Sequence, residues 1–323
     1  MVIDKGVFRF LFRFFQFYRK NKHKKIILLK SAHPYNASMY SWGDYHFACD
    51  LGVGLAFSGD FATFVVPFEY WNIDCVNNRA DVSLVISGVR KATIHSANPH
   101  YLYVISHPEI LSEDYVKQFQ HVFCASEHLT DLLSEQAHSV SYLPQFTNEK
   151  RFYSCVEDNS DLSNQVIFIG NTRNTYREVV KICVEAGISI AVYGKGWEQY
   201  IPATLIKGEY VDNNQLRYFY SNAAIVLNDH WPEMREQGFI SNRVFDVSAC
   251  NGFIISDHIS ALEKIYSGAV TTYTSEQDLV KKINYFLEHP QERKALAAKA
   301  RQVTLQSHTN KAVASEILQV IRA

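Results

Sequence analysis

The chain has 323 residues, which is long for a single hydrophobic core and predicts two domains. Apolar residues make up 47% of it and charged residues 20%, as in an ordinary globular protein. The formal net charge of −1 excludes a strong overall attraction to nucleic acid, so we expect no nucleic-acid partner. The six Cys are scattered without zinc-binding spacing, and we find no secretory signal peptide, which together predict reduced thiols in a cytoplasmic protein.

Residues 1–25 are expected to form a region of their own. The stretch 7–25, "VFRFLFRFFQFYRKNKHKK", is mostly aromatic and then basic, and Arg9, Arg13 and Gln16 recur in it at helical spacing. This pattern predicts an amphipathic helix lying in the headgroup region of an anionic membrane, so that the protein would be peripheral at the inner face of the cytoplasmic membrane. The alternative is a helix docked on the protein's own core or on a second subunit.

Strands and helices alternate through residues 26–150, the first predicted domain. The sequence predicts strands at 25–32, 61–67, 80–87, 101–105, 121–126 and 140–146, and helices at 44–58, 112–120 and 127–136. The strand cores are continuously apolar rather than alternating. Such strands are typical of a parallel sheet that is covered on both faces.

After the polar linker 147–164 the pattern restarts, and it defines a second domain at 151–323. The sequence predicts strands at 165–170, 188–194, 223–229 and 252–256, and helices ending near 186 and at 213–221, 242–250, 275–288 and 290–306. The predicted fold class is therefore α/β, with two doubly wound, Rossmann-like domains. Ligands of open parallel sheets bind beyond the carboxyl ends of the strands, so the expected site is a central cleft that the two domains face.

Two strand–helix joints in the second half are suited to anions. Gly170 ends a strand, and the loop that follows it contains Asn171 and Arg173 and leads into a helix. A helix N-terminus offers unpaired N–H groups to a phosphate, and Arg173 or Arg177 would add charge. An ordinary joint with a capping Asn or Thr is the alternative. Neither a G-x-G-x-x-G fingerprint nor a Walker loop is present.

The second joint lies in residues 237–257, "QGFISNRVFDVSACNGFIISD". Ser241 and Asn242 are good N-cap residues for a helix that carries Arg243 and Asp246. A diphosphate at the helix start beside Arg243, and a ribose diol on the Asp246 carboxylate, are what a nucleotide sugar would present. The alternative is a surface ion pair on an amphipathic helix.

Several fragments resemble, in their order and spacing, the CgeB-like, group 1 glycosyltransferases of the GT-B fold. In the second half these are "FIGN", "VYGKGW", "GEYVDNNQLRYFYSNAAIVLND", "GFISNRVFDVSACNGFIISD" and "ERKALAAKARQVTLQSHT". In the first half "WGDYHFACDLGVGLAFSGDFATFVV", "YVISHPE" and "HVFCASEHLTDLLSE" agree with the matching amino-terminal domain. The resemblance extends over residues 30–320.

The resemblance implies a glycosyltransferase with the donor in the second domain and the acceptor on the side of the first. Tyr210 and Val211 would lie by the base of the donor, Arg243 would meet its diphosphate, and Asp246 would take the place of the family's ribose-binding Glu. The donor would be a UDP-sugar by family habit. The acceptor would be a glycan or a lipid-linked acceptor in bacterial surface polysaccharide synthesis. We expect no cofactor and no metal, because GT-B enzymes stabilise the leaving group with helix ends and cations and no Asp-x-Asp pair is present.

A general base is needed to deprotonate the acceptor hydroxyl. The candidates in the first half are Asp44 and His46 in "WGDYH" and His107 in "SHPE", each close to the end of a predicted strand. Asp44 in an inverting mechanism is slightly favoured, although it could instead cap its helix and His107 could be a structural turn. Retaining relatives have a Glu eight residues before the ribose acid. Here that position is Gly238 and only Glu236 is close by, so the stereochemistry stays open.

Three other functions fit the same pattern. One is a retaining transferase, which product anomer analysis by NMR would recognise. Another is a nucleotide-sugar epimerase or hydrolase of the same fold, which would need no acceptor site. The third is a non-catalytic nucleotide-sugar or glycan-binding subunit of a polysaccharide assembly complex.

Overall fold

A computed structural model describes residues 5–94, 98–157 and 160–323 and divides the chain into two compact units. The first unit comprises the described residues up to Gln145 together with Glu236–Phe239 and Asn310–Ala323. The second comprises Phe146–Arg235 and Ile240–Thr309. Each unit has its own parallel six-stranded sheet, which confirms the predicted α/β class with two doubly wound domains.

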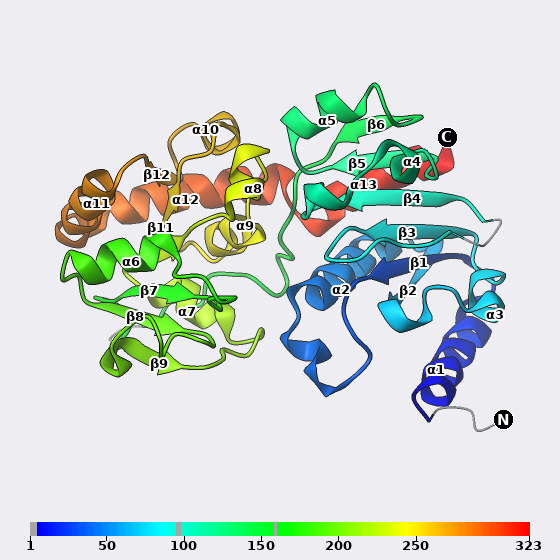
Figure 1. The fold of residues 1–323 in the computed structure, drawn as a ribbon, viewed down its shortest axis with the longest axis horizontal. Helices are drawn as coiled ribbons and strands as arrows, with labels where there is room; N and C mark the ends of the chain where they lie inside the picture. The colour runs from blue at the N-terminus through cyan, green and yellow to red at the C-terminus, as the bar shows by residue number, and fades with distance from the viewer. Residues whose placement is uncertain (1–4, 95–97, 158–159) are drawn as a thin grey trace. The chain divides into compact units, whose positions relative to one another are not determined.

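The sheet of the first unit has the strand order β2-β1-β3-β4-β5-β6, and all its pairs are parallel (Figure 1). Its strands are β1 (Lys25–Ser31), β2 (Phe61–Pro67), β3 (Val82–Ile86), β4 (His100–Val104), β5 (His121–Cys124) and β6 (Val140–Tyr142). The strand order reverses between β1 and β3. In an open parallel sheet this switch point, at the carboxyl ends of the strands, is where ligands bind.

Helices cover both faces of this sheet. They are α1 (Lys5–Asn21), α2 (Gly43–Leu55), α3 (Asp74–Asn77), α4 (Glu113–Val116), α5 (Glu127–Leu133) and α13 (Asn310–Arg322), with short 3-10 helices at Ala37–Ser41, Ala56–Ser58, Phe68–Tyr70 and Pro108–Ile110. The predicted helix 44–58 corresponds to α2 and the 3-10 turn after it, and the turn ends at Gly59, whose φ of 85° favours glycine. The predicted helix 112–120 is shorter in the structure.

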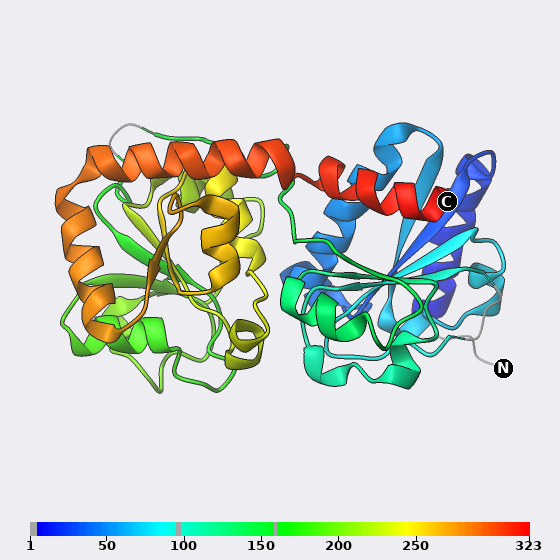
Figure 2. The ribbon, with the colours of Figure 1, turned by 90° about the horizontal axis from the view of Figure 1, so that it is seen from above.

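Helix α13 corrects the predicted domain boundary, because the sequence division placed all of 151–323 in the second domain. In the structure α13 packs on α2 of the first unit (Figure 2). Its Asn310 side chain donates to the Asp50 carbonyl at 2.9 Å. A Cβ on Gly54 would lie 2.2 Å from the Asn310 carbonyl oxygen, so glycine is required for this close approach.

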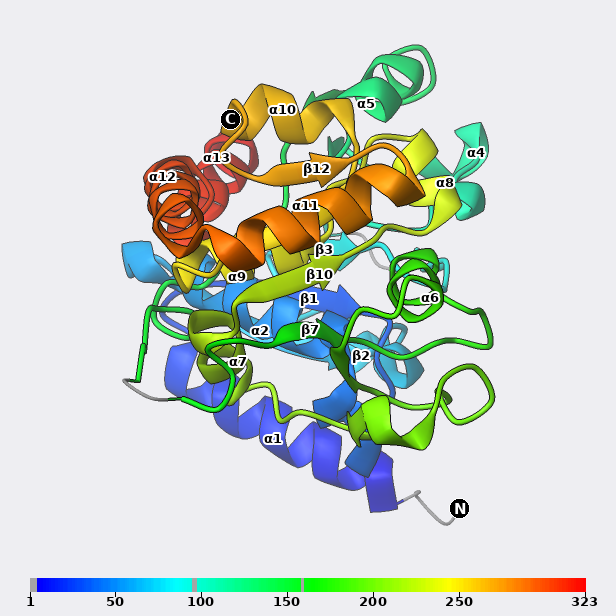
Figure 3. The same cartoon turned by 90° about the vertical axis from the view of Figure 1, so that its left-hand side faces the viewer.

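Helix α1 buries one aromatic face against the first unit's own core. The Phe10 ring lies 4.4 Å from that of Tyr70, and the Phe14 and Phe17 rings lie 5.2 Å and 5.1 Å from Phe64 of β2. Figure 3 shows α1 beside β2, the edge strand of this sheet. The docking alternative is therefore confirmed for the inner face, while a membrane contact of the outer face stays a prediction. Residues 1–4 of the predicted N-terminal region lie outside the described residues.

The sheet of the second unit has the order β12-β11-β10-β7-β8-β9, again all parallel, and it reverses between β7 and β10. Its strands are β7 (Val166–Ile169), β8 (Ile190–Tyr193), β9 (Ile206–Gly208), β10 (Ile225–Asn228), β11 (Ile254–Asp257) and β12 (Thr271–Tyr273). Its helices are α6 (Glu178–Glu185), α7 (Leu216–Asn222), α8 (Pro232–Glu236), α9 (Asn242–Ala249), α10 (Ser260–Tyr266), α11 (Glu276–Glu288) and α12 (Pro290–Ser307), with a 3-10 helix at Ala203–Leu205. The last residue of α8, Glu236, groups with the first unit.

Candidate functional site

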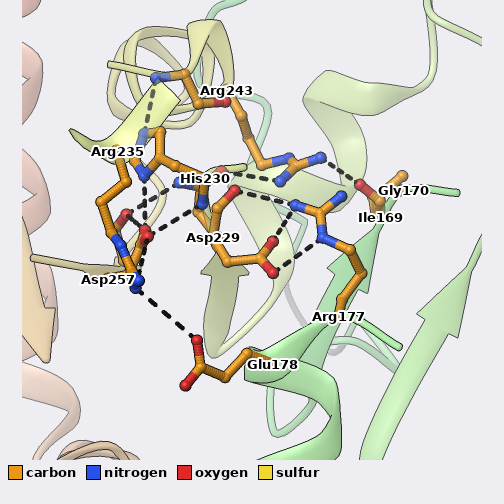
Figure 4. Close-up of polar contacts among 12 residues, drawn as sticks. Ile169, Gly170, Arg177, Glu178, Asp229, His230, Arg235, Arg243 and Asp257 are labelled. Carbon is orange, nitrogen blue, oxygen red and sulfur yellow. Dashed lines mark hydrogen bonds and ion pairs between the residues drawn. The ribbon is translucent and has the colours of Figure 1, made fainter. Parts of the chain in front are cut away.

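Arg243 lies at the switch point of the second sheet. It is the second residue of α9, and its guanidinium donates to the Asn228 side chain at the end of β10 (2.8 Å) and to the Ile169 carbonyl at the end of β7 (2.6 Å) (Figure 4). These are the two strands between which the order reverses. The predicted cation therefore stands where a doubly wound sheet binds its ligand, beside the N-terminus of a helix.

A buried His–Asp pair fixes the start of α9. The Asp257 carboxylate at the end of β11 accepts a hydrogen bond from Nδ1–H of His230 at 2.6 Å. The Nε2 atom of His230 in turn accepts the backbone N–H of Ser241 at 2.9 Å (Figure 4). Burial alone would raise the pKa of Asp257, but hydrogen bonds from His230 and Ser256 hold it below its usual value, so Asp257 is ionised at neutral pH. The charged acceptor keeps His230 in the tautomer that can hold Ser241.

A second buried pair neutralises the predicted anion site at α6. Arg177, the N-cap residue of α6, donates through Nε to Asp229 at 2.9 Å and through a second nitrogen to the other carboxylate oxygen (Figure 4). Burial raises the pKa of Asp229, and the contacts with Arg177 oppose that rise. Glu178 adds a carboxylate to the first turn of the helix. The expectation that Arg177 supplies charge to a phosphate is wrong, because its charge is already paired inside the protein.

The loop that holds Gly170, Asn171 and Arg173 is packed tightly against the loop after β8. The Asn171 side chain accepts the Lys195 N–H at 2.8 Å, and the Trp197 indole donates to the Gly170 carbonyl at 2.8 Å. The Arg173 backbone is left-handed, with φ of 51°, and its guanidinium lies 5.4 Å from the Trp231 ring centre. All three residues follow β7 at the ligand-binding edge, and their contact with a donor stays a prediction.

Asp246 is buried and already has partners. Its carboxylate accepts a hydrogen bond from the Thr147 hydroxyl at 2.8 Å and another from the Asn242 amide at 2.9 Å. A ribose at this carboxylate would share it with these two partners. Ser241 occupies the N-cap position of α9, as predicted, but its side chain makes no capping hydrogen bond. Within the described residues the buried Asn242 Oδ1 has no hydrogen-bond partner, so it is an acceptor that a ligand hydroxyl could satisfy.

Two of the predicted base candidates lie at the carboxyl edge of the first sheet. Asp44 is in the first turn of α2, and its carboxylate lies 3.1 Å from the position of a Cβ on Gly88, which follows β3. The Ser31 hydroxyl at the end of β1 donates to the Asp44 carbonyl at 3.2 Å. Asp44 therefore sits at the β1/β3 switch point of the first unit.

His107 follows β4 on the same edge. Its Nδ1 atom lies 2.7 Å from the Glu109 carboxylate, so a neutral ring presents Nε2 as a proton acceptor. Its φ of 55° is left-handed, which is uncommon for a residue with a side chain. His46, in contrast, donates its Nε2–H to the Tyr40 carbonyl at 2.8 Å, which removes that nitrogen as a base. The contact of Glu109 with His107 was not predicted.

Comparisons with known proteins agree with this architecture. Residues 174–319 match the model of a family described as glycosyl transferase-like. The spore protein CgeB of Bacillus subtilis (strain 168) is 28% identical over 187 residues, which are 53% of this chain and 58% of that protein. Both matches relate the chain to the CgeB-like, group 1 glycosyltransferases. The match with the curated relative thus spans less than two thirds of its length.

Solved glycosyltransferase structures share the GT-B fold with this chain. Sucrose-phosphate synthase from Thermosynechococcus elongatus superimposes with a TM-score of 0.66 at 13% identity, covering 93% of this chain and 98% of the other. Anabaena Alr3699/HepE in complex with UDP and glucose gives a TM-score of 0.64 at 12% identity, covering 93% and 100%. A DNA-modifying beta-glucosyltransferase gives 0.62 at 14% identity, with the same coverage. At these identities the likeness establishes the fold alone.

The remaining residues predicted from the family are spread over both units. Tyr210 and Val211 follow β9, at the carboxyl edge of the second sheet, and the Tyr210 side chain is half exposed. Glu236 ends α8 and is exposed, and Gly238 has a left-handed φ of 74°. In the described ranges no three His, Cys, Asp or Glu side chains converge as a metal site. No helix of the described chain combines the length and apolar character that a bilayer crossing needs.

Proposed function

We propose that this protein transfers a sugar from a nucleotide-diphosphate sugar, with UDP as the nucleotide, to a glycan or lipid-linked acceptor. The observation that carries the proposal is Arg243 at the β7/β10 switch point, at the start of α9. Its guanidinium is held by Asn228 and Ile169, so the charge is oriented before a ligand arrives. The match to the glycosyl transferase-like family over residues 174–319 and the UDP complex of a GT-B neighbour support the donor class.

The Arg243→Ala variant is expected to bind UDP about 10- to 100-fold more weakly than the wild-type protein. The reason is the loss of a charge-assisted contact to the diphosphate, which contributes about 1.5–3 kcal/mol. Isothermal titration calorimetry with UDP measures the change. Arg322→Ala removes an arginine from a surface ion pair with Asp60 and is the matched control. Unchanged affinity in a folded Arg243→Ala variant would remove Arg243 from the donor site.

We propose that the first unit supplies the general base from its own carboxyl edge. His107 has the better-built arrangement, since Glu109 orients its ring and leaves Nε2 to accept a proton from the acceptor hydroxyl. Asp44, which the sequence favoured, remains the competing base at the neighbouring strand ends. A protein base acting on the acceptor implies inversion at the anomeric carbon, which NMR of the product would test.

Catalysis is proposed to be independent of metal. The positive groups near the switch point, Arg243 and the N-terminus of α9, would stabilise the leaving diphosphate without an ion. EDTA is therefore expected to leave the transfer rate unchanged, as followed by UDP release in a coupled assay. Complete loss of turnover that Mn²⁺ or Mg²⁺ restores would contradict this prediction.

We further propose a cytoplasmic location, with the protein peripheral at the inner face of the cytoplasmic membrane and acting in the synthesis of surface polysaccharide or glycoconjugate. The six cysteines are free thiols, as expected for a reducing compartment. The outer face of α1 supports the membrane contact, because Phe8 and Phe12 are 64% and 55% exposed there. Fractionation of cells into soluble and membrane fractions would test the location.

A further inference from the structure

A basic pocket of about 280 Å³ lies beside the end of α1. It is lined by Tyr18, Lys22, Lys24, Ile26, Asn78, Arg79, Ala80 and Asp81. The lining residues come from three segments of the chain: the end of α1, the start of β1 and the turn before β3. It belongs entirely to the first unit and involves none of the donor-site residues.

The charge balance of this pocket is positive. Lys22, Lys24 and Arg79 contribute three cations, and Asp81 contributes the single carboxylate. One oxygen of that carboxylate accepts a hydrogen bond from the Ile26 backbone N–H at 2.7 Å. Arg79 is held in place by a hydrogen bond from its Nη1 to the Cys75 carbonyl at 2.8 Å. The lining therefore suits an anion with several acceptor oxygens, such as a phosphate group.

An aromatic row, exposed at Phe8 and Phe12 and half-buried at Phe15, leads along α1 to the same pocket. Phe8, Phe12 and Phe15 recur at spacings of four and three residues, which place them along one face of the helix. This face points away from the buried Phe10 and Phe14. The Arg79 guanidinium lies 5.1 Å from the Phe15 ring centre and 5.8 Å from that of Tyr18, so the end of the row and the pocket meet at one side chain.

We infer that this surface docks on an anionic membrane and that the pocket receives the phosphate of a lipid headgroup. The aromatic row would enter the boundary between headgroups and acyl chains, while Lys22, Lys24 and Arg79 contact the phosphate. A lipid is a better partner for this surface than a second copy of this chain. Arg9 and Arg13 lie on the same helix as the aromatic row, and in a symmetric dimer these positive charges would repel those of the second copy. The inference deepens the membrane contact proposed above and rests on it.

The test is flotation of the full chain with vesicles of phosphatidylcholine, with and without phosphatidylglycerol, at low salt. Each basic residue near an anionic surface contributes about a fivefold factor in binding. The triple variant Lys22→Ala/Lys24→Ala/Arg79→Gln is therefore expected to bind the phosphatidylglycerol vesicles on the order of 100-fold more weakly than wild type. The control variant Lys281→Ala/Lys294→Ala/Lys299→Ala removes the same charge from the second unit and should bind like wild type.

The outcomes distinguish a lipid headgroup from free phosphate as the ligand of the pocket. Phe8→Ala/Phe12→Ala should weaken binding to both kinds of vesicle, whereas inorganic phosphate at matched ionic strength should compete no better than chloride. Wild-type binding by the triple variant, equal loss in the control variant, or selective release by inorganic phosphate would overturn the inference. The inference would also be overturned if the wild-type chain binds neither kind of vesicle and instead forms dimers that become monomers in the Phe8→Ala/Phe12→Ala variant. UDP calorimetry on the same variants keeps a failed donor proposal distinct, because none of these substitutions touches the donor site.

Discussion

The His107→Gln variant is expected to turn over about 10²–10⁴ times more slowly than wild type while it binds UDP normally. Glutamine keeps a polar side chain of similar reach but cannot accept and release the acceptor's proton. The effect should therefore appear in kcat, with donor affinity from calorimetry unchanged. Initial rates at saturating donor and acceptor are the measurement.

Two further variants show whether His107 acts as the base. Glu109→Gln keeps the hydrogen bond to Nδ1 but removes its charge, so an intermediate loss of about tenfold is expected. Asp44→Asn should leave kcat close to the wild-type value if His107 is the base. Near-normal turnover of His107→Gln, together with a loss of 10²-fold or more in Asp44→Asn, would transfer the role to Asp44.

The Arg177→Met variant is expected to lose about 3–5 kcal/mol of stability, because it leaves the buried Asp229 carboxylate without its partner. The loss should be local to the second unit. Hydrogen exchange followed by mass spectrometry measures it, since peptides covering β7 and β10 should exchange faster while those covering β1 and β3 keep their protection.

The double variant Arg177→Met/Asp229→Leu is the control for this prediction. Replacing both partners by apolar side chains removes the uncompensated charge, so most of the protection of β7 and β10 should return. Equal exchange in the single and double variants would show that Arg177 acts through its packing against Phe168 and Trp231 rather than through its charge.

Strands were predictable where a short apolar run is bounded by a conformational signal. The β2 strand begins just after Gly59-Asp60 and ends at Pro67, and its predicted bounds are those of the structure. The β9 and β12 strands, of three residues each, were not predicted, whereas β6, equally short, was predicted as part of the longer stretch 140–146. The docking of α13 on α2 was not predictable either, because the contact between Gly54 and Asn310 joins residues that are distant in the chain.

In the candidate site, too, some residues were predictable from the sequence and others were not. Arg243 was predictable because the cap residues, the cation and the following strand are contiguous in the sequence. The pairs Arg177–Asp229 and His230–Asp257 were not, because their members are 52 and 27 residues apart and the sheet order alone brings them together. One signal was available: Asp229 and Asp257 each stand at the end of a predicted strand, where parallel topology gathers polar side chains.

The return of α13 to the first unit determines the order in which the protein can fold during synthesis. The second unit ends at Thr309, so its residues have all left the ribosome before residues 310–322 appear. The first unit is translated earlier but must wait for Val313, Ala314, Ile317 and Leu318 to cover its α2 face. The first unit therefore completes its packing only when the segment that follows the second unit is available, which departs from the usual N-to-C order. Until then the α2 face that these four side chains cover stays exposed.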